Sequence, residues 1–208
     1  MQEQIQEIKE EPRIKFFDKY SAEGLEIKDS ALKPYLSFEP RLLVKSYGRN
    51  LEKFAKGKVN IIERIANRMG VPGHSGKKHK IITGWASGKY NKNMANVMKA
   101  LDIIAQKTQK NPLQVVSDAV VNGSPRDEIT VIEQAGARYP QAVDCSPLRR
   151  IDLAIRWIVQ GSYQRCFGKK KKMAESLAEE IIKASQGNME SYSVNKRNES
   201  EKQADSAR

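Results

Sequence analysis

The sequence is poor in the residue types on which most enzymes and metal sites depend. Its 208 residues include two cysteines, Cys145 and Cys166, and two histidines, His74 and His79, which share one short loop. The cysteines have no CxxC spacing and are typical of reduced cytosolic thiols. No carboxylate or cysteine near the histidines completes a metal site. Nucleophile elbows and paired acids in apolar surroundings are missing too, so we expect no catalysis, cofactor, metal or small-molecule substrate.

Long apolar runs and targeting segments are also missing. No stretch approaches the roughly 18 apolar residues that a membrane-spanning helix requires. The N-terminal residues, MQEQIQEIKEEP, are acidic and polar, unlike a signal peptide or an Arg-rich transit peptide. We therefore expect a cytoplasmic protein without a membrane partner. A chain of this length with 39% apolar residues suits one globular domain with extensions, or at most two small domains.

Acidic residues are scarce in one long block of the chain. Residues 41–110 hold 16 basic and 3 acidic side chains, a net charge of +13, whereas residues 1–40 have a net charge of −3. Since the whole chain has a formal net charge of +12, the excess lies almost wholly in this block. A skew of this size favours a polyanionic partner, with a solvated basic surface as the alternative.

The sequence does contain a strong helical periodicity. Apolar residues recur at the spacing of amphipathic helices in five segments, at about residues 57–69, 91–108, 111–123, 147–163 and 170–185. Between the third and fourth segments the period changes to alternation around a turn-prone QAGAR, which predicts a β-hairpin at about 128–145. We expect a mainly α fold, a bundle of five to six helices with this hairpin protruding between the third and fourth.

Composition divides the chain into three parts. An irregular N-terminal extension covers residues 1–55, and we expect its first 12 residues to be disordered. Within the extension, RIKFF and RLLVKSY can form short strands, and DSALKPYL can form a helical turn. A helical domain, which we expect to bind the polyanionic partner, then covers residues 56–190, and a polar tail that can form one more helix covers residues 191–208.

Two of the predicted helices have clear start signals. In the third, Asn111 occupies the N-cap and Pro112 the first helical position, and Gln114 completes a pattern like a capping box. In the fourth, Ser146 occupies the N-cap and Pro147 the first helical position. Both helices should therefore begin where these residues place them.

The first turn of the fourth predicted helix carries an unusual charge. Arg149 and Arg150 lie where the helix dipole favours Asp or Glu. A bound phosphate would resolve this, because it accepts hydrogen bonds from free helix N–H groups and from both arginine forks. The alternative is that either arginine pairs with a carboxylate elsewhere, such as Asp144. Arg156 lies on the same side of the helix as Arg149, and Asp152 is the only acid near them.

The loop GHSGKKHK suits an extended polyanion better than a nucleotide. It is not a Walker A loop, because Val71 stands in place of the first glycine and Lys78 in place of Ser or Thr. Glycines between lysines allow a phosphodiester chain to approach the backbone closely. Trp85 and Tyr90 flank the loop and can stack on bases, with core packing as an equal alternative for Trp85. A second basic cluster, KKKK at residues 169–172, stands at the start of the fifth helix.

Three long stretches carry a resemblance to a known family. They are NPLQVVSDAVVNGSPRDEIT, GARYPQAVDCSPLRRIDLAIRWIVQGSYQR and KKMAESLAEEIIKASQG, and in this order they closely resemble the small-subunit ribosomal protein seven family. IKFFDKYSAEGLEIKDSALKPYL looks like the N-terminal region of its archaeal and eukaryotic branch. The resemblance covers roughly residues 13–208. It implies a mostly helical fold with a protruding hairpin and a structural role without catalysis.

The resemblance also implies partners. These are small-subunit rRNA, in whose head (3′ major) domain the protein would nucleate assembly, and neighbouring head proteins, with the exit-site tRNA and the mRNA exit path nearby. The family's helical body and glycine-lysine loop face rRNA, and its hairpin tip points toward the exit-site tRNA. The residues that we expect at rRNA are Lys58, Lys77, Lys78, Lys80, Lys89, Lys92, Arg126, Arg149, Arg150, Arg156, Lys169, Lys170, Lys171 and Lys172. Those at the hairpin tip are Gln134, Ala135, Gly136, Ala137, Arg138 and Tyr139.

Two features of the hairpin depart from the family. Its members commonly carry Gly-Gly at the tip, where this chain has Ala135-Gly136-Ala137, and Glu133 stands where the bacterial branch is basic. From the residues alone, a sequence-nonspecific DNA-binding or nucleoid-type protein and a scaffold for acidic proteins are alternatives. A DNA-binding protein of this kind would form a dimer that contacts two matched half-sites. The sequence has no heptad repeat or second symmetric unit through which such a dimer would form.

Overall fold

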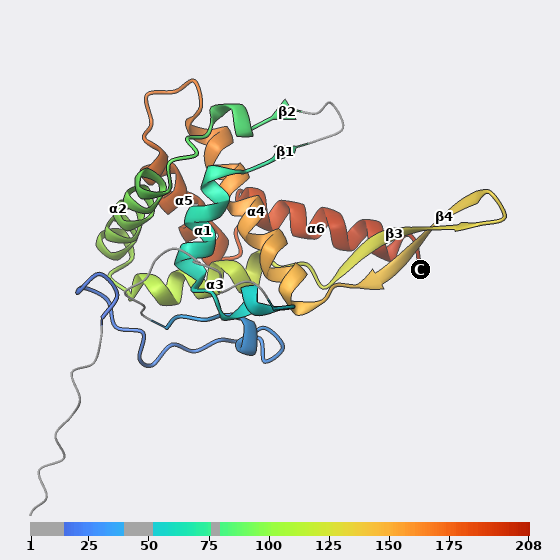
Figure 1. The fold of residues 1–208 in the computed structure, drawn as a ribbon, viewed down its shortest axis with the longest axis horizontal. Helices are drawn as coiled ribbons and strands as arrows, with labels where there is room; N and C mark the ends of the chain where they lie inside the picture. Colours follow the sequence, from blue (N-terminus) through green and yellow to red (C-terminus); the bar gives the residue numbers. More distant parts are fainter. Residues whose placement is uncertain (1–14, 40–51, 76–79) are drawn as a thin grey trace, which may run out of the picture.

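Helices make up most of the part of the chain that the computed structural model describes, residues 15–39, 52–75 and 80–208 (Figure 1). The α-helices in these ranges are α1 (Ile61–Gly70), α2 (Tyr90–Thr108), α3 (Pro112–Gly123), α4 (Pro147–Cys166), α5 (Met173–Ser185) and α6 (Tyr192–Asp205). Strands β3 (Asp127–Gln134) and β4 (Ala137–Asp144) form an antiparallel hairpin between α3 and α4. The prediction of a mainly α fold with this hairpin is confirmed.

Short elements complete the described chain. Strands β1 (His74–Ser75) and β2 (Lys80–Ile81) pair antiparallel, and 3-10 turns occur at η1 (Lys33–Tyr35), η2 (Ala55–Lys58) and η3 (Thr83–Trp85). The helical turn predicted within DSALKPYL is therefore confirmed as η1. No helix in the described ranges is long and apolar enough to span a bilayer.

Helix α5 lies at the centre of the helical body, where it contacts α2, α3 and α4. Its Leu177 and the facing Leu101, Leu113 and Ile158 are almost completely buried. Burying a side chain of this size contributes about 1.5–3 kcal/mol. The apolar stripes found in the sequence therefore form one core, against which α1 and α4 are held rigidly.

One predicted helix start and one predicted capping interaction need correction. Helix α1 begins at Ile61 rather than at about 57, because η2 precedes it and the side chain of Asn60 caps it by accepting from Ile62 N at 2.9 Å. Asn111 caps α3 as expected, by accepting from Leu113 N at 3.1 Å. The capping box at Gln114 is wrong. Its side chain instead exchanges two hydrogen bonds with the backbone of Glu26 in the N-terminal extension.

The fourth and fifth helices also differ from their predicted bounds. Helix α4 continues through Cys166, one turn beyond the predicted 163, since Cys166 still packs against the core. Helix α5 begins only at Met173, so residues 169–172 lie in the connection that precedes it. The polar tail forms α6, which packs against α4 and β3.

The described part of the N-terminal extension, residues 15–39, runs along α3 and the start of α4 (Figure 1). Tyr20 donates to Asp102 Oδ1 of α2 at 2.6 Å, which adds to the bonds that Gln114 makes. The strand predicted in RIKFF is wrong for its described residues, because Phe16 makes only an isolated bridge with Tyr20. RLLVKSY and residues 1–12 lie outside the described ranges.

The hairpin projects away from the helical body (Figure 1). Its register pairs Asp127 with Asp144 at the base and Gln134 with Ala137 at the tip. Ala135 and Gly136 connect the strands with φ of 48° and 80°. Two positive φ values are what a two-residue type I′ turn requires. Its base packs against α6, whereas every residue of 131–140 is exposed.

Candidate RNA interface

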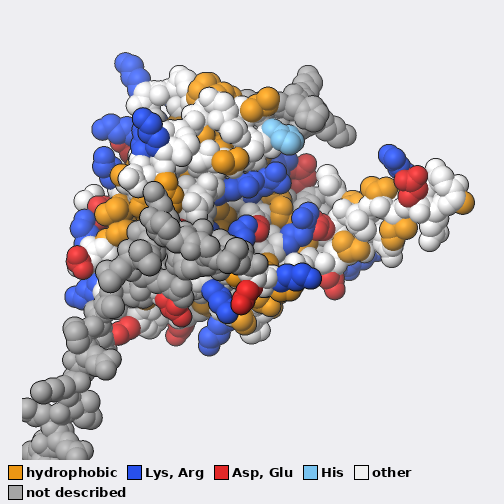
Figure 2. All heavy atoms as spheres, in the orientation of Figure 1, with side chains coloured by type: hydrophobic (Ala, Val, Ile, Leu, Met, Phe, Trp, Pro, Cys, Tyr) orange, Lys and Arg blue, Asp and Glu red, His pale blue; other side chains and the backbone are white. Residues whose placement is uncertain are grey.

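One face of α1 and α4 gathers positive charge around a surface pocket of about 430 Å³. The pocket is lined by four basic side chains, Lys56, Arg68, Arg149 and Arg156, and by one carboxylate, Asp152. Figure 2 shows Lys and Arg side chains gathered over the region that α1 and α4 occupy in the same view. We call this surface the α1–α4 face. Its excess of cations makes it the strongest candidate for binding a polyanion.

The carboxylate on the α1–α4 face is fully engaged. Lys56 Nζ lies 2.8 Å from Asp152 Oδ2, and Arg64 Nη2 lies 3.0 Å from Asp152 Oδ1. Burial alone would raise the pKa of Asp152, but the hydrogen bonds from Lys56 and Arg64 lower it below its ordinary value. Asp152 is therefore ionised at neutral pH and paired with Lys56 and Arg64. Its charge still acts on Arg68, but among the described residues it forms no ion pair with Arg68 or Arg156.

Arg149 is exposed and pairs with the hairpin. Its Nη2 donates to Glu128 Oε2 of β3 at 2.6 Å, and its Nε also contacts this carboxylate. This hydrogen bond raises the pKa of the Arg149 guanidinium. The side chain is 55% exposed, and ion pairs at such positions contribute at most about 1 kcal/mol. An RNA phosphate can therefore compete for Arg149, and its contact with rRNA stays a prediction.

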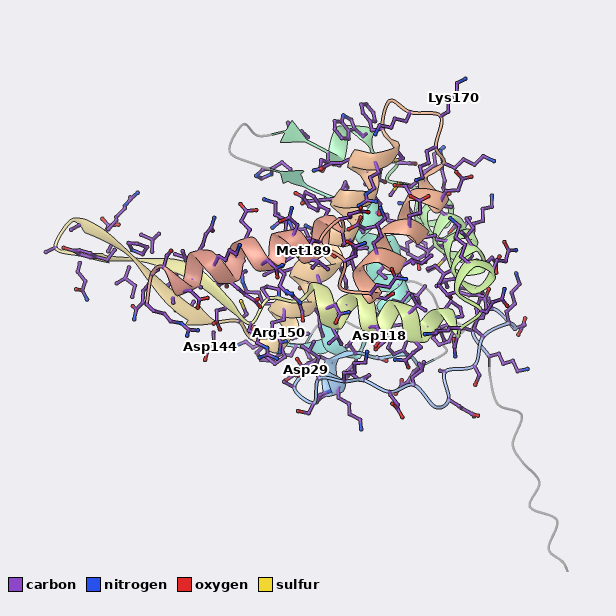
Figure 3. All side chains as sticks on the ribbon, turned by 180° about the vertical axis from the view of Figure 1, so that it is seen from behind. Asp29, Asp118, Asp144, Arg150, Lys170 and Met189 are labelled. Atoms are coloured by element: carbon purple, nitrogen blue, oxygen red, sulfur yellow. The ribbon has the colours of Figure 1, made fainter. Side chains whose placement is uncertain are left out.

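Arg150 is buried and has three acceptors. Its Nη2 donates to Asp29 Oδ2 at 2.7 Å and to Ser124 Oγ at 3.4 Å, and its Nε donates to Pro125 O at 3.2 Å. Figure 3 shows Arg150 beside Asp29, at the start of α4. The alternative that either arginine pairs with a carboxylate is confirmed, and it holds for both, although the partners are Glu128 and Asp29 rather than Asp144. Contact of Arg150 with rRNA stays a prediction, which its burial does not favour.

The start of α4 is confirmed at Ser146 and Pro147, but the Ser146 side chain makes no capping hydrogen bond. Arg149 and Arg150 leave the helix axis in different directions, one toward the hairpin and one toward the extension. The two arginines therefore do not share one anion at the helix start. The charge anomaly in this turn is resolved mainly by protein carboxylates.

A second cationic surface lies in the connection between α4 and α5. Lys169, Lys170 and Lys172 are exposed, whereas Lys171 pairs with Glu179. Lys170 extends outward at the end of the molecule that lies away from the hairpin (Figure 3). The exposed lysines of this connection are free to meet a phosphate chain.

Trp85 packs against an aromatic ring that sequence reasoning did not single out. Phe167 follows α4, and its ring stacks on Trp85 at a centroid distance of 4.0 Å and an interplanar angle of 7°. Trp85 is half-buried and Phe167 is exposed. The ring of Trp85 is thus partly packed, as one of its two alternatives predicted. Phe167 had no signal in the sequence beyond its place before the lysine cluster.

The remaining predicted cations are spread over several surfaces. Four of them are exposed: Lys58, Lys89, Lys92 and Arg126. Lys58 ends η2, Lys89 precedes α2 and Lys92 lies in its first turn. Arg126 precedes β3. Arg126 borders a pocket of about 770 Å³ whose lining mixes both signs of charge. Lys80 lies in β2, and Lys77 and Lys78 lie outside the described residues. The structure brings none of the four described cations Lys58, Lys89, Lys92 and Arg126 into the pocket of the α1–α4 face.

Sequence reasoning missed two residues of the α1–α4 face, Lys56 and Arg68. A signal was present, because Arg64 and Arg68 are four residues apart and so lie on one side of their helix. Only the apolar positions of that helix were interpreted. The predicted tip residues Gln134, Ala135, Gly136, Ala137, Arg138 and Tyr139 are all exposed, and their position near tRNA or mRNA stays a prediction.

The cysteines are chemically quiet. Burial, and then the nearby charge of Glu128, raises the pKa of Cys145 to about 11. Burial also raises the pKa of Cys166. Thiols with raised pKa values are weak nucleophiles at neutral pH. Across the described residues, no group of three or more His, Cys, Asp or Glu side chains is placed to hold a metal ion.

Comparison with protein families settles the class of this chain. The family described as Ribosomal protein S7p/S5e matches residues 44–208, which include the α1–α4 face and the hairpin. The chain belongs to the ribosomal protein S7p/S5e family. The family resemblance seen in the sequence is thus confirmed. Members of the S7p/S5e family are structural, non-enzymatic proteins, so the expectation of no catalysis agrees with the family.

Relatives of the chain carry the name small ribosomal subunit protein uS7. The protein of Nanoarchaeum equitans is 42% identical over 197 residues, which cover 94% of this chain and 100% of the relative. That of Methanococcus maripaludis (strain C6) is 42% identical over 198 residues, covering 94% and 99%. That of Methanococcus vannielii is 38% identical over 201 residues, covering 96% and 98%. These S7p/S5e proteins are archaeal, as expected, and membership gives the chain a structural role in the ribosome.

Proposed function

We propose that this chain is a structural constituent of the small ribosomal subunit in the cytoplasm, where it binds rRNA of the head (3′ major) domain. The observation that carries the proposal is the α1–α4 face. It holds four basic side chains around one carboxylate that is already shared, and it belongs to the segment that the S7p/S5e family matches. Neighbouring head proteins are the expected protein partners.

The chemistry of the face suits RNA backbone rather than a small ligand. Phosphate contacts set the affinity and the position of the protein, and the shape of an RNA junction supplies selectivity. Both helices are anchored in the core, so the cations are presented at fixed positions. The exposed lysines at 169, 170 and 172 extend the same interaction to a second surface. If about six to ten phosphates are neutralised, affinity should fall by orders of magnitude as salt rises.

The hairpin suits a separate contact. It is exposed over residues 131–140 and projects from the body. This exposure suits the position near the exit-site tRNA and the mRNA exit path that the resemblance in the sequence implies. Arg138 is the one cation at the tip, and its Nε lies 3.5 Å from Glu133 Oε2. With so little free positive charge, this hairpin would meet RNA by shape and packing, through Tyr139 and its neighbours, more than by charge.

Removing the two arginines that α4 contributes to the pocket tests the proposal. The double variant Arg149→Ala, Arg156→Ala should bind a head-domain rRNA fragment at least tenfold more weakly than the unaltered chain, because it loses charge-assisted hydrogen bonds of about 1.5–3 kcal/mol each. Its circular dichroism spectrum should remain helical. An unfolded double variant would mean that the two arginines are structural, and unchanged binding would remove α4 from the interface.

A further inference from the structure

Arg68 and Arg156 come from different helices and converge on one point. A methyl group added to the Cα of Gly73 would lie 3.6 Å from Nη2 of Arg156 and 3.7 Å from Nη2 of Arg68. The two guanidinium groups thus meet beside a bare backbone. Gly73 has a φ of +84°, a conformation that favours glycine, and the missing side chain leaves this space open.

Within the described ranges, neither arginine forms an ion pair with a carboxylate, although their neighbours on the same helices do. Arg64, one turn before Arg68 on α1, is paired with Asp152 at 3.0 Å, and Arg149, two turns before Arg156 on α4, is paired with Glu128. The Nε atoms of Arg68 and Arg156 are buried and have no hydrogen-bond partner in this part of the chain. Buried donors without acceptors are rare in folded proteins.

Two like charges facing each other, half-withdrawn from water, destabilise the protein that contains them. Burial, and then the nearby charge of Arg156, lowers the pKa of the Arg68 guanidinium. Gln160 does not relieve the repulsion, because the atom that it presents beside Gly73 is Nε2, a donor, which donates to the carbonyls of Pro72 and His74 at 2.9 and 3.2 Å. An anion between the two Nη2 groups would give both guanidinium groups a charged acceptor and remove the repulsion together.

We propose that Arg68 and Arg156 form a seat for a single RNA phosphate, a contact that rests on the proposed function and adds Arg68 to it. Both side chains line the pocket of the α1–α4 face, so the phosphate enters from solvent. Lys56 and Arg149 on the same rim attract the RNA backbone toward it. Gly73 borders the seat beside the two Nη2 atoms.

Binding of the full chain to a head-domain rRNA fragment, titrated with salt, tests the seat. Arg68→Gln and Arg156→Gln should each weaken binding about tenfold to hundredfold, as expected for a lost charge-assisted phosphate contact. Since one phosphate is shared, the double variant should lose less affinity than the product of the single effects. For the double variant, the slope of the logarithm of the binding constant against the logarithm of the salt concentration should become shallower by about one rather than by about two. Lys202→Gln, which removes an exposed charge from α6, should change neither quantity.

Thermal unfolding without RNA separates a ligand site from a structural one. In chloride buffer, Arg68→Gln should melt at the same temperature as the unaltered chain or above it, because the variant relieves repulsion. Arg64→Gln should melt lower, because it removes a buried guanidinium from its ion pair with Asp152. At constant ionic strength, inorganic phosphate should raise the melting temperature of the unaltered chain more than that of Arg68→Gln. An Arg68→Gln variant as unstable as Arg64→Gln would overturn the proposal.

The seat and the proposed function can fail separately. If the unaltered chain prefers the head fragment, but the double glutamine variant keeps its affinity and salt slope, the seat is refuted and the function stands. If the unaltered chain binds all RNAs equally, but the variants still lose affinity with a slope change of about one, the seat is supported and the proposed rRNA target is refuted.

Discussion

Arg150 joins two segments that lie far apart in the sequence. Asp29, its carboxylate partner, is 121 residues away in the N-terminal extension, and Pro125 and Ser124 precede the hairpin. Burial alone would raise the pKa of Asp29, but the hydrogen bond from Arg150 and the backbone N–H of Ala31 lower it. This ion pair therefore anchors the extension to the body, and a side chain that the sequence favoured for RNA turns out to hold the fold.

Removing the carboxylate should leave Arg150 buried without compensation. Asp29→Asn should lower the free energy of unfolding by about 2–4 kcal/mol, since breaking a buried pair leaves one charge unpaired. Asp118→Asn is the matched control. Asp118 pairs with Lys28, which is 66% exposed, so its loss should cost less than about 1 kcal/mol. Urea denaturation measures the free energy of unfolding of each variant. An equal loss in Asp29→Asn and Asp118→Asn would contradict the anchoring role of Arg150.

The same pair predicts a pH dependence with a definite sign. Because the pKa of Asp29 is lowered in the folded state, its contribution is fully present above the ordinary value of 3.8. That contribution is lost as pH falls through the lower folded value. The stability difference between the unaltered chain and Asp29→Asn should therefore be constant near pH 6 and shrink below about pH 4. If the stability difference between the two chains is the same at pH 2 as at pH 6, the ionised Asp29 does not contribute through its pair with Arg150.

Cys145 offers a chemical probe of the hairpin base. With a pKa of about 11 against an ordinary 9.0, its thiolate is scarce near pH 8. Iodoacetamide should therefore modify Cys145 about a hundredfold more slowly in the folded chain than in urea, and faster as pH approaches 11. In a Cys166→Ser background, Cys145 is the one remaining cysteine, so all the measured modification comes from it. Equal rates in the folded and unfolded chains would show that the hairpin base is open in solution.

At the scale of elements, the hairpin turn carries a residue that does not suit its conformation. Ala135 has a φ of 48°, which costs a residue with a Cβ about 1–2 kcal/mol, whereas Asn tolerates it. Ala135→Asn should stabilise the hairpin by roughly 0.5–1 kcal/mol and slow amide exchange in β3 and β4 twofold to fivefold. Ala137→Asn is the control, because this neighbour does not have a positive φ. Faster exchange in Ala135→Asn would contradict the turn geometry.

The elements themselves were largely predictable, because amphipathic periodicity reflects burial on one face. Helices α2 and α3 match their predicted bounds closely, and the hairpin lies within one residue of its prediction. What failed was the choice of hydrogen-bond partner. Gln114 has the spacing of a capping box, but the backbone of Glu26, 88 residues away, binds it instead. Local patterns do not report such distant partners, so helix starts were less accurate than helix faces.

At the scale of the whole molecule, charge pattern predicted the kind of partner but not the surface that meets it. The block of residues 41–110 supplies Lys56, Arg64 and Arg68, and α4 supplies the facing arginines. Which cations remain uncompensated depends on the carboxylates that folding brings near. Arg149, Arg150 and Arg64 acquire such partners, whereas Arg68 and Arg156 do not, and no one-dimensional pattern distinguishes the two groups.

The central claim is that this chain recognises a particular rRNA fold through its cationic surfaces. The most direct test is a salt-titrated binding assay against three ligands, namely a head-domain fragment of small-subunit rRNA, an unrelated structured RNA of equal length, and duplex DNA. We expect a preference of about a hundredfold or more for the head fragment that survives at physiological salt, because shape selectivity adds to the phosphate contacts. Equal binding to all three ligands, lost together as salt rises, would contradict the claim and leave only a generic basic surface.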